Sequence, residues 1–237
     1  MQPAPPDIAI VIPVLNEREN LELLLPSLLT VSGELGLGAE IIVVDGGSTD
    51  GSQRAAEQLG AHVIVQQERG FGSALLAGFA ASSARYVIAM DADLSHPPKF
   101  IKDFWPQRAE AELVIASRYV AGGQAEMGAV RHLLSLILNR VYGRVLSLPT
   151  RDLSSGFRMY HRNILTSLQL QARDFDIQEE ILVKFHIQGW RIKEVPFHYM
   201  ARNSGKSHAK LLRLGWAFSK TLLRMWRLQN SAEGSKH

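Results

Sequence analysis

Short apolar runs alternate with helix-like segments through the first half of the chain, and this alternation limits the fold more than any other feature. The apolar runs cover residues 8–14, 40–45, 61–66, 86–90 and 112–117. Helical patterns follow at residues 16–30, 52–59, 73–83 and 98–107, with a glycine-containing turn at 32–38. Strands that alternate with helices at this spacing form a mostly parallel sheet with helices on both faces. The sequence therefore predicts an α/β, Rossmann-like fold built as one domain.

The composition narrows the class of protein. The chain has 237 residues and no cysteine, which excludes disulfides, thiolate metal sites and cysteine nucleophiles and suits a reducing compartment. Residues 1–7 are proline-rich and lack the apolar stretch of a signal peptide, and no apolar run is long enough to predict a transmembrane span. The formal charge is only +3, with the basic residues clustered late in the chain. We expect flexible ends at residues 1–7 and 229–237 and no nucleic-acid partner.

Two carboxylates, Asp91 and Asp93, come directly after the fourth apolar run. Side chains alternate along an extended chain, so both would project to the same side, at the strand end where open α/β sheets bind ligands. Adjacent carboxylates repel, and a divalent cation such as Mg²⁺ or Mn²⁺ relieves that cost while bridging to a diphosphate. The alternative is an N-cap, in which Asp93 or Ser95 begins the helix that follows Pro97.

A second aspartate, Asp45, ends another apolar run and would lie along the same sheet edge. Gly70 and Gly72 precede the helix at 73–83, where glycine permits close backbone approach and a helix N-terminus favours anionic groups. In a Gly-x-Gly-x-x-Gly motif that began at Gly70, Leu75 would stand in place of the third glycine, which disfavours dinucleotide binding.

Motifs along most of the chain resemble those of family 2 glycosyltransferases. The early ones are Ile-Pro-Val-Leu-Asn-Glu at 12–17, Val-Asp-Gly-Gly-Ser-Thr-Asp-Gly at 44–51, the glycine-bounded helix at 72–78 and Met-Asp-Ala-Asp-Leu-Ser-His-Pro-Pro at 90–98. The segments at 116–119, 152–158, 178–180 and 194–197 resemble the dolichyl-phosphate (polyprenyl-phosphate) mannosyltransferase branch. The resemblance spans residues 8–208 and implies a GT-A domain over 8–209, in which a nucleotide-binding sheet joins an acceptor-binding half.

The resemblance also implies a role for each matching residue. Asp91 and Asp93 would hold the sugar diphosphate through Mg²⁺ or Mn²⁺, and the catalytic candidates are Asp93, Glu180 and Gln178. The nucleotide-sugar site would comprise Pro13, Asn16, Glu17, Asp45, Gly70, Gly72, Asp91, Arg118, Arg202 and Lys206. The acceptor candidates are Arg131 and Ser155. The chain departs from the family pattern at Gly46, where relatives often have a second aspartate, at Ser95, where close relatives often have glutamine, and at His208, where the pattern has lysine.

The implied reaction is inverting transfer of a hexose from a nucleotide-diphosphate sugar to a polyprenyl phosphate. GDP-mannose is the first candidate donor and UDP-glucose the second. A lipid phosphate is already anionic and needs no strong base, whereas a saccharide or small-molecule hydroxyl would need a carboxylate to take its proton. Glu180 is the candidate base and Asp176 the second, although both equally suit first-turn acids that complement a helix dipole.

Two functions from other classes share parts of this pattern. A nucleotidyltransferase would have the same sheet and acidic site, but it predicts a basic glycine-rich loop after the first strand, where this chain has Pro13-Val-Leu-Asn-Glu. An inactive nucleotide-sugar sensor is disfavoured by the presence of Asp91, Asp93 and Glu180.

Two late segments are amphipathic helix candidates. Within 210–228, basic residues occupy one arc of a helical wheel and leucines and tryptophans the rest, which is typical of a helix in a membrane interface. Within 131–148, an apolar side combines with arginines suited to anionic phosphate. Packing of both helices on the core or on a second subunit is the alternative. We expect a peripheral enzyme on the cytoplasmic face of a membrane, with a membrane anchor protein or a second copy as partner.

Overall fold

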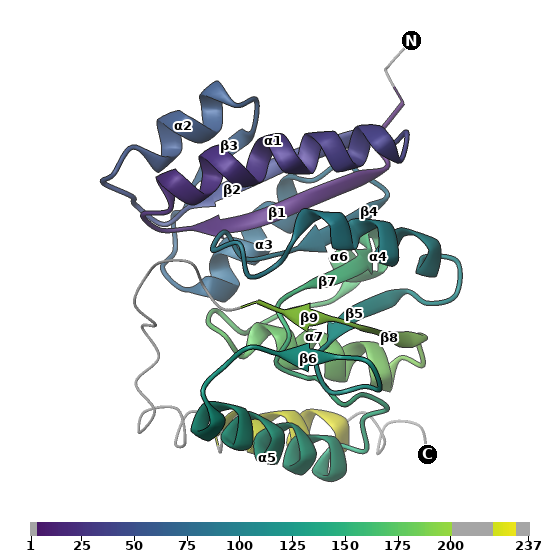
Figure 1. Cartoon of the computed structure of the whole chain (residues 1–237). Coiled ribbons are helices and arrows are strands. Elements are labelled where there is room, and N and C mark those ends of the chain that lie inside the picture. Colours follow the sequence, from purple (N-terminus) through teal and green to yellow (C-terminus); the bar gives the residue numbers. More distant parts are fainter. Residues whose placement is uncertain (1–3, 201–219, 231–237) are drawn as a thin grey trace.

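The structure is a computed structural model that describes residues 4–200 and 220–230, and its centre is a seven-stranded sheet (Figure 1). The strand order is β3-β2-β1-β4-β7-β5-β8. The strands are β1 (Ile8–Val14), β2 (Ala39–Asp45), β3 (His62–Val65), β4 (Tyr86–Ala89), β5 (Leu113–Ser117), β7 (Arg158–His161) and β8 (Ile192–Pro196). A separate parallel pair joins β6 (Gln124–Ala125) to β9 (His198–Tyr199). The sheet pairs are parallel except that β7 runs antiparallel to both β4 and β5.

Helices cover both faces of the sheet, which confirms the expected α/β class. The helices are α1 (Arg18–Glu34), α2 (Ser52–Gln58), α3 (Phe71–Ala81), η1 (Pro98–Phe100), α4 (Ile101–Gln107), α5 (Ala129–Val145), α6 (Arg162–Ser167) and α7 (Ile177–Ile187). Alternate residues of β1 enter different cores: Ile10 packs with α1 and α4, whereas Val11 packs with α3 and α7. This alternation is the two-residue period of a strand buried on both sides.

Most element boundaries lie within one or two residues of the expected ones, and two differences are of interest here. Helix α1 continues to Glu34 and takes up the first residues of the expected turn, because Val31 and Ser32 are buried. Strand β4 ends at Ala89, so Asp91 lies two residues beyond the extended segment.

The second half of the chain adds α5 and the helical residues 220–230, which lie side by side at the bottom of Figure 1. Met225 is buried in the same core as α3 and α7, and Leu222 and Leu228 pack against that core. The described part of the predicted 210–228 helix therefore docks on the protein, and residues 210–219 lie outside the described residues. Within 4–200 and 220–230, no helix combines the length and apolar character needed to cross a bilayer.

Candidate functional site

The carboxyl ends of β1, β2 and β4 meet at one edge of the sheet. Asp45 lies opposite Val14, and Ala89 lies opposite Val11 in the parallel register. Asp45 and the segment that begins at Asp91 therefore reach the same edge, as the sequence predicted.

Asp91 and Asp93 have different surroundings at this edge. The Asp91 side chain is 32% exposed, whereas Asp93 is 5% exposed. One Asp93 carboxylate oxygen accepts hydrogen bonds from the Ser95 backbone N–H at 3.1 Å and from the Ser95 hydroxyl. Leu94, between them, has a φ of +62°, a backbone region that L-residues seldom adopt. The expectation that both carboxylates project alike from a strand fails here, because the chain has left the extended conformation.

The N-cap alternative is not observed for either residue. The N-cap position of η1 is Pro97, and no side-chain capping hydrogen bond is present there. Ser95 is fully buried and donates to Asp93, so its hydroxyl stabilises the turn after β4 rather than facing the site.

The loops after β1 and β2 hold one another through side-chain to backbone hydrogen bonds. The Asn16 N–H donates to the Ser48 hydroxyl at 2.8 Å, and the Thr49 N–H donates to the Asn16 Oδ1 at 2.8 Å. The carboxylate of Asp45 accepts from the N–H groups of Gly47 and Ser48 and is 2% exposed. Asp45 thus stabilises the turn after β2, and its predicted contact with the nucleotide stays a prediction.

Two further predicted residues lie in the same region. Glu17 donates its backbone N–H to Ser52 Oγ at 2.9 Å, and its carboxylate accepts from the Asn20 amide at 2.5 Å. Pro13 lies opposite Val44 and is partly exposed.

Gly70 and Gly72 lie against the chain's own backbone rather than beside an open phosphate cradle. A Cβ on Gly70 would stand 2.1 Å from the Arg173 carbonyl oxygen, and one on Gly72 would stand 2.8 Å from the Asp174 carbonyl oxygen. The Ser73 N–H, in the first turn of α3, donates to the Arg173 carbonyl at 3.1 Å. The close approach expected for these glycines occurs, but its partner is the loop before α7.

Arg118, at the end of β5, is paired within the protein. Its guanidinium donates to both carboxylate oxygens of Asp152, at 2.8 and 2.6 Å, and to the Ser154 hydroxyl at 2.8 Å. Burial lowers the pKa of Arg118, but its hydrogen bonds and charge interaction with fully buried Asp152 outweigh this and raise it. The pair anchors residues 152–155 to β5. Ser155, an acceptor candidate, is 4% exposed in that segment.

A second arginine, Arg158, is fully buried and was not singled out from the sequence. Its guanidinium donates to the carbonyl oxygens of Ser155, Gln178 and Leu153. Gln178 also accepts from the Tyr160 hydroxyl at 3.0 Å. Arg158 therefore ties the segment before β7 to the start of α7.

Glu180 makes several contacts of its own. Its carboxylate accepts from the N–H groups of Gln171 and Ala172 and lies 2.8 Å from the Lys184 ammonium. Burial raises the pKa of Glu180, but the Lys184 contact and the two backbone hydrogen bonds more than offset this and leave it below its ordinary value. One Glu180 oxygen also lies 3.6 Å from the guanidinium of Arg224.

Three predicted residues remain. Arg131 belongs to α5, while Arg202 and Lys206 lie outside the described residues. Two residues beside Asp91 were missed: His96 contacts it, and Gly156 leaves space next to its carboxylate. Both stood inside the motifs at 90–98 and 152–158, but spacing alone did not show that those motifs meet.

The chain matches a known protein family over most of its length. A protein-family sequence model described as glycosyl transferase family 2 matches residues 9–168, more than half of the chain. The chain belongs to glycosyltransferase family 2.

Curated relatives of this family 2 chain include two lipid-phosphate enzymes by name. A dolichol-phosphate mannosyltransferase of Pyrococcus furiosus is 33% identical over 216 residues, covering 86% of this chain and 59% of the relative. A polyprenol monophosphomannose synthase of Mycolicibacterium smegmatis is 32% identical over 213 residues, covering 84% of this chain and 79% of the relative. The chain thus spans less than two thirds of the first relative's length.

Solved structures with the same fold include glucosyl-3-phosphoglycerate synthase from Mycobacterium tuberculosis. Its complex with phosphoglyceric acid superposes with a TM-score of 0.72 at 24% identity, over 94% of this chain and 80% of that one. Its complex with Mn²⁺, UDP and glucosyl-3-phosphoglycerate also has a TM-score of 0.72, at 25% identity and the same coverage. The expected GT-A fold is therefore confirmed.

The residues at the sheet edge fit a divalent cation only with help from a ligand. Within the described residues, no group of three or more His, Asp or Glu side chains is arranged to hold a metal ion. Asp91 offers partly exposed carboxylate oxygens, which are the donors that Mg²⁺ and Mn²⁺ prefer. Asp91 and Asp93 are the residues that would hold such a cation, and diphosphate oxygens and water would supply its other ligands.

Proposed function

We propose that this family 2 enzyme transfers a hexose from a nucleotide-diphosphate sugar to a polyprenyl phosphate, with inversion, at the cytoplasmic surface of a membrane. The names of the curated relatives support mannose, and hence GDP-mannose, as the first candidate, and UDP-glucose is the second. The observation that carries the acceptor proposal is an apolar surface on α5 and the helical residues 220–230.

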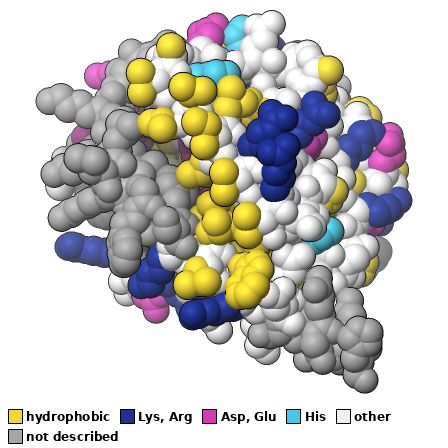
Figure 2. All heavy atoms as spheres, turned by 90° about the horizontal axis from the view of Figure 1, so that it is seen from below, with side chains coloured by type: hydrophobic (Ala, Val, Ile, Leu, Met, Phe, Trp, Pro, Cys, Tyr) yellow, Lys and Arg dark blue, Asp and Glu magenta, His cyan; other side chains and the backbone are white. Residues whose placement is uncertain are grey.

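Helix α5 turns its apolar side outward. The exposed apolar side chains recur at helical spacing, and their exposed fractions run from 37% to 70%: Val130, Leu133, Leu134, Leu136, Ile137, Val141 and Val145. Figure 2 shows a band of apolar side chains across this face, with Lys and Arg side chains beside it. Contiguous exposed apolar surface rimmed by basic residues suits contact with anionic lipid.

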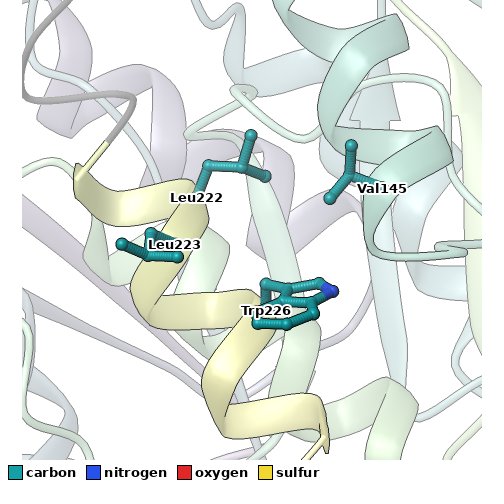
Figure 3. A pocket seen from close by; sticks show the side chains of 4 residues that line it. All are labelled: Val145, Leu222, Leu223 and Trp226. Carbon is teal, nitrogen blue, oxygen red and sulfur yellow. The ribbon is translucent and has the colours of Figure 1, made fainter.

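The neighbouring helix continues this surface. Leu223 and Trp226 are 47% and 45% exposed, and with Val145 and Leu222 they line an open hollow of about 390 Å³ between the two helices (Figure 3). Tryptophan is enriched where a protein meets the membrane interface. A lipid-borne acceptor would approach the enzyme from this side.

The donor half of the reaction depends on charge stabilisation. Breaking the bond between sugar and diphosphate builds negative charge on the leaving group, and a divalent cation held at Asp91 would supply that stabilisation. Asp93 and Ser95 fix the turn after β4 that carries Asp91, and the loops around Asn16 and Asp45 lie at the same edge of the sheet.

A phosphate acceptor also suits the surroundings of Glu180. A hydroxyl acceptor requires a base, whereas the Glu180 carboxylate accepts two backbone N–H groups and pairs with Lys184, with a lowered pKa. A base of lowered pKa is a weaker proton acceptor near neutral pH.

The test is a transfer assay with labelled GDP-mannose and UDP-glucose in Mn²⁺ or Mg²⁺, with polyprenyl phosphate in vesicles or 3-phosphoglycerate as acceptor. We expect lipid-linked mannose from GDP-mannose, and loss of transfer when the cation is chelated. Transfer to 3-phosphoglycerate but not to the lipid would reject the acceptor. Transfer of the nucleoside monophosphate group from a nucleoside triphosphate to a sugar phosphate, with release of pyrophosphate, would favour a nucleotidyltransferase.

Glu180→Gln separates the two acceptor classes further. With a phosphate acceptor we expect kcat within about 5-fold of wild type, whereas loss of a general base lowers it about 10²–10⁴-fold. The matched control is Glu57→Gln, an exposed residue on α2. A loss of the larger size with unchanged folding would restore Glu180 as the base.

A further inference from the structure

His96 contacts Asp91 at two points. The backbone N–H of Asp91 donates to Nδ1 of His96 at 2.9 Å. Nε2 of the same ring lies 3.8 Å from a carboxylate oxygen of Asp91. Because Nδ1 accepts a hydrogen bond, the proton of the neutral ring is on Nε2, the nitrogen nearer the carboxylate. One imidazole thus contacts both the main chain and the side chain of Asp91.

The His96 ring is held by aromatic side chains from the second half of the chain. It is 3% exposed and stacks on Phe157, with centroids 4.8 Å apart and an interplanar angle of 13°. The rings of Phe197 and Tyr199 meet it edge-on at 5.9 and 6.2 Å. A ring enclosed in this way cannot follow Asp91, so it limits the positions that Asp91 can take.

Gly156 borders the same carboxylate. A Cβ at this position would stand 3.6 Å from one Asp91 carboxylate oxygen and 3.9 Å from Cε1 of His96. The missing side chain leaves space beside the oxygen, while Phe157, the next residue, supplies the stacking ring. The segment before β7 therefore borders the Asp91 carboxylate at Gly156 and stacks on His96 through Phe157.

We propose that His96 is a positioning residue that directs the Asp91 carboxylate toward the divalent cation accompanying the sugar diphosphate. This inference rests on the proposed function, since it requires that cation. Residues that orient a metal-ligating side chain typically change metal affinity by about 10- to 100-fold when replaced.

Three substitutions of His96 distinguish orientation from packing. His96→Phe keeps a stacking ring and removes both nitrogens. His96→Asn places an amide oxygen near the position of Nδ1, whereas His96→Gln carries its polar atoms one bond further out. Should His96→Phe fail to fold, the comparison of His96→Asn with His96→Gln tests the same point.

The measurement is calorimetric titration of Mn²⁺ into the full chain saturated with GDP, and separately with UDP. We expect His96→Phe and His96→Gln to weaken Mn²⁺ binding by about 10- to 100-fold and His96→Asn to restore most of the loss. In turnover, KM for the nucleotide sugar at limiting Mn²⁺ should rise, while kcat at saturating Mn²⁺ changes less.

The control is Phe100→Leu, because Phe100 belongs to the same aromatic cluster and contacts Phe157 and Phe197. Equal weakening by Phe100→Leu would assign the effect to packing and overturn the proposal, as would wild-type Mn²⁺ binding in the His96 variants. Wild-type protein that binds no Mn²⁺ with either nucleotide would reject the cation site and the inference together. Absence of lipid transfer with the binding pattern intact would reject only the proposed acceptor.

Discussion

Helices α1 and α5 have the same length, 17 residues, yet they use their leucines in opposite ways. On α1, Leu21, Leu24, Leu25 and Leu28 are fully buried against the sheet. On α5, Leu133, Leu134 and Ile137 are about half exposed, and the residues turned inward are Asn139, Tyr142 and, just past the helix end, Leu146. The half with α1 therefore buries most leucines of its helix and exposes Leu23 and Leu29, whereas the half with α5 exposes most of the apolar side chains of its helix within the described residues.

The polar groups of the two halves also differ in how deeply they are buried. Around β1, β2 and β4, short hydrogen bonds join neighbouring loops and leave Asp91 partly exposed at the edge. In the second half, Arg158 and Glu179 are buried, and Arg158 joins the segment before β7 to the start of α7.

The largest expected effect on activity concerns Asp91, in the half with α1. Asp91→Asn removes the partly exposed carboxylate charge, and we expect transfer to fall by about 10²–10³-fold, the size typical of losing one stabilising group at a developing charge. Circular dichroism and thermal unfolding should match wild type. Asp103→Asn, at an exposed site on α4, is the control. Undiminished turnover in Asp91→Asn would show that the Asp91 carboxylate is not needed for transfer, and the half with α1 would then have no demonstrated role in it.

Arg158→Met tests how the buried polar contacts hold the second half together. The change leaves three buried carbonyl oxygens without their cationic donor, so we expect a loss of unfolding free energy of about 3 kcal/mol in urea. Arg151→Met, at an exposed neighbouring position, should change stability by less than about 0.5 kcal/mol. A small effect at Arg158 would mean that apolar packing, rather than these hydrogen bonds, holds the segment before β7 against α7.

Glu179 predicts a pH dependence that belongs to the second half. Burial raises the pKa of Glu179 to about 7 from its ordinary value of 4.5. Between these values the folded chain binds the proton more tightly than the unfolded chain, so this residue's contribution is full below pH 4.5 and is lost as pH rises toward 7. Because glutamine does not titrate, Glu179→Gln should abolish this part of the pH-dependent loss in unfolding free energy, which amounts to at most roughly 3 kcal/mol. Urea unfolding of both proteins from pH 4.5 to 7.5 measures it, and parallel curves would contradict it.

The smallest change concerns the exposed surface. Ile137→Asp should weaken binding to anionic vesicles about 10-fold or more, because an apolar side chain of this size contributes about 1.5–3 kcal/mol when buried. Leu23→Asp is the matched control, since Leu23 is 64% exposed on α1 and should affect vesicle flotation little. Equal loss in both variants would show that charge, not the α5 surface, governs binding.

Local patterns predicted the first half of the fold closely. The apolar runs at 8–14 and 40–45 became β1 and β2 nearly residue for residue, because strands buried on both faces must be continuously apolar. The patterns did not predict that β7 enters the sheet antiparallel between β4 and β5, since Arg158–His161 is short and begins with a charge. The same limit hid Arg158 itself, whose partners are carbonyl oxygens up to 20 residues away.

The sequence by itself determined the fold class, the edge at which Asp45 and Asp91 meet, and the resemblance to family 2 glycosyltransferases, because these follow from periodicity and motif order. Only the tertiary structure decided that Asp91 and Asp93 have separate environments, that Gly70 and Gly72 receive the chain's own backbone, and that His96 lies between Asp91 and Phe157. Each of these depends on contacts between segments distant in sequence or on a turn with an uncommon φ. The spacing of residues along the chain predicts neither long-range contacts nor the φ angle of a single turn residue.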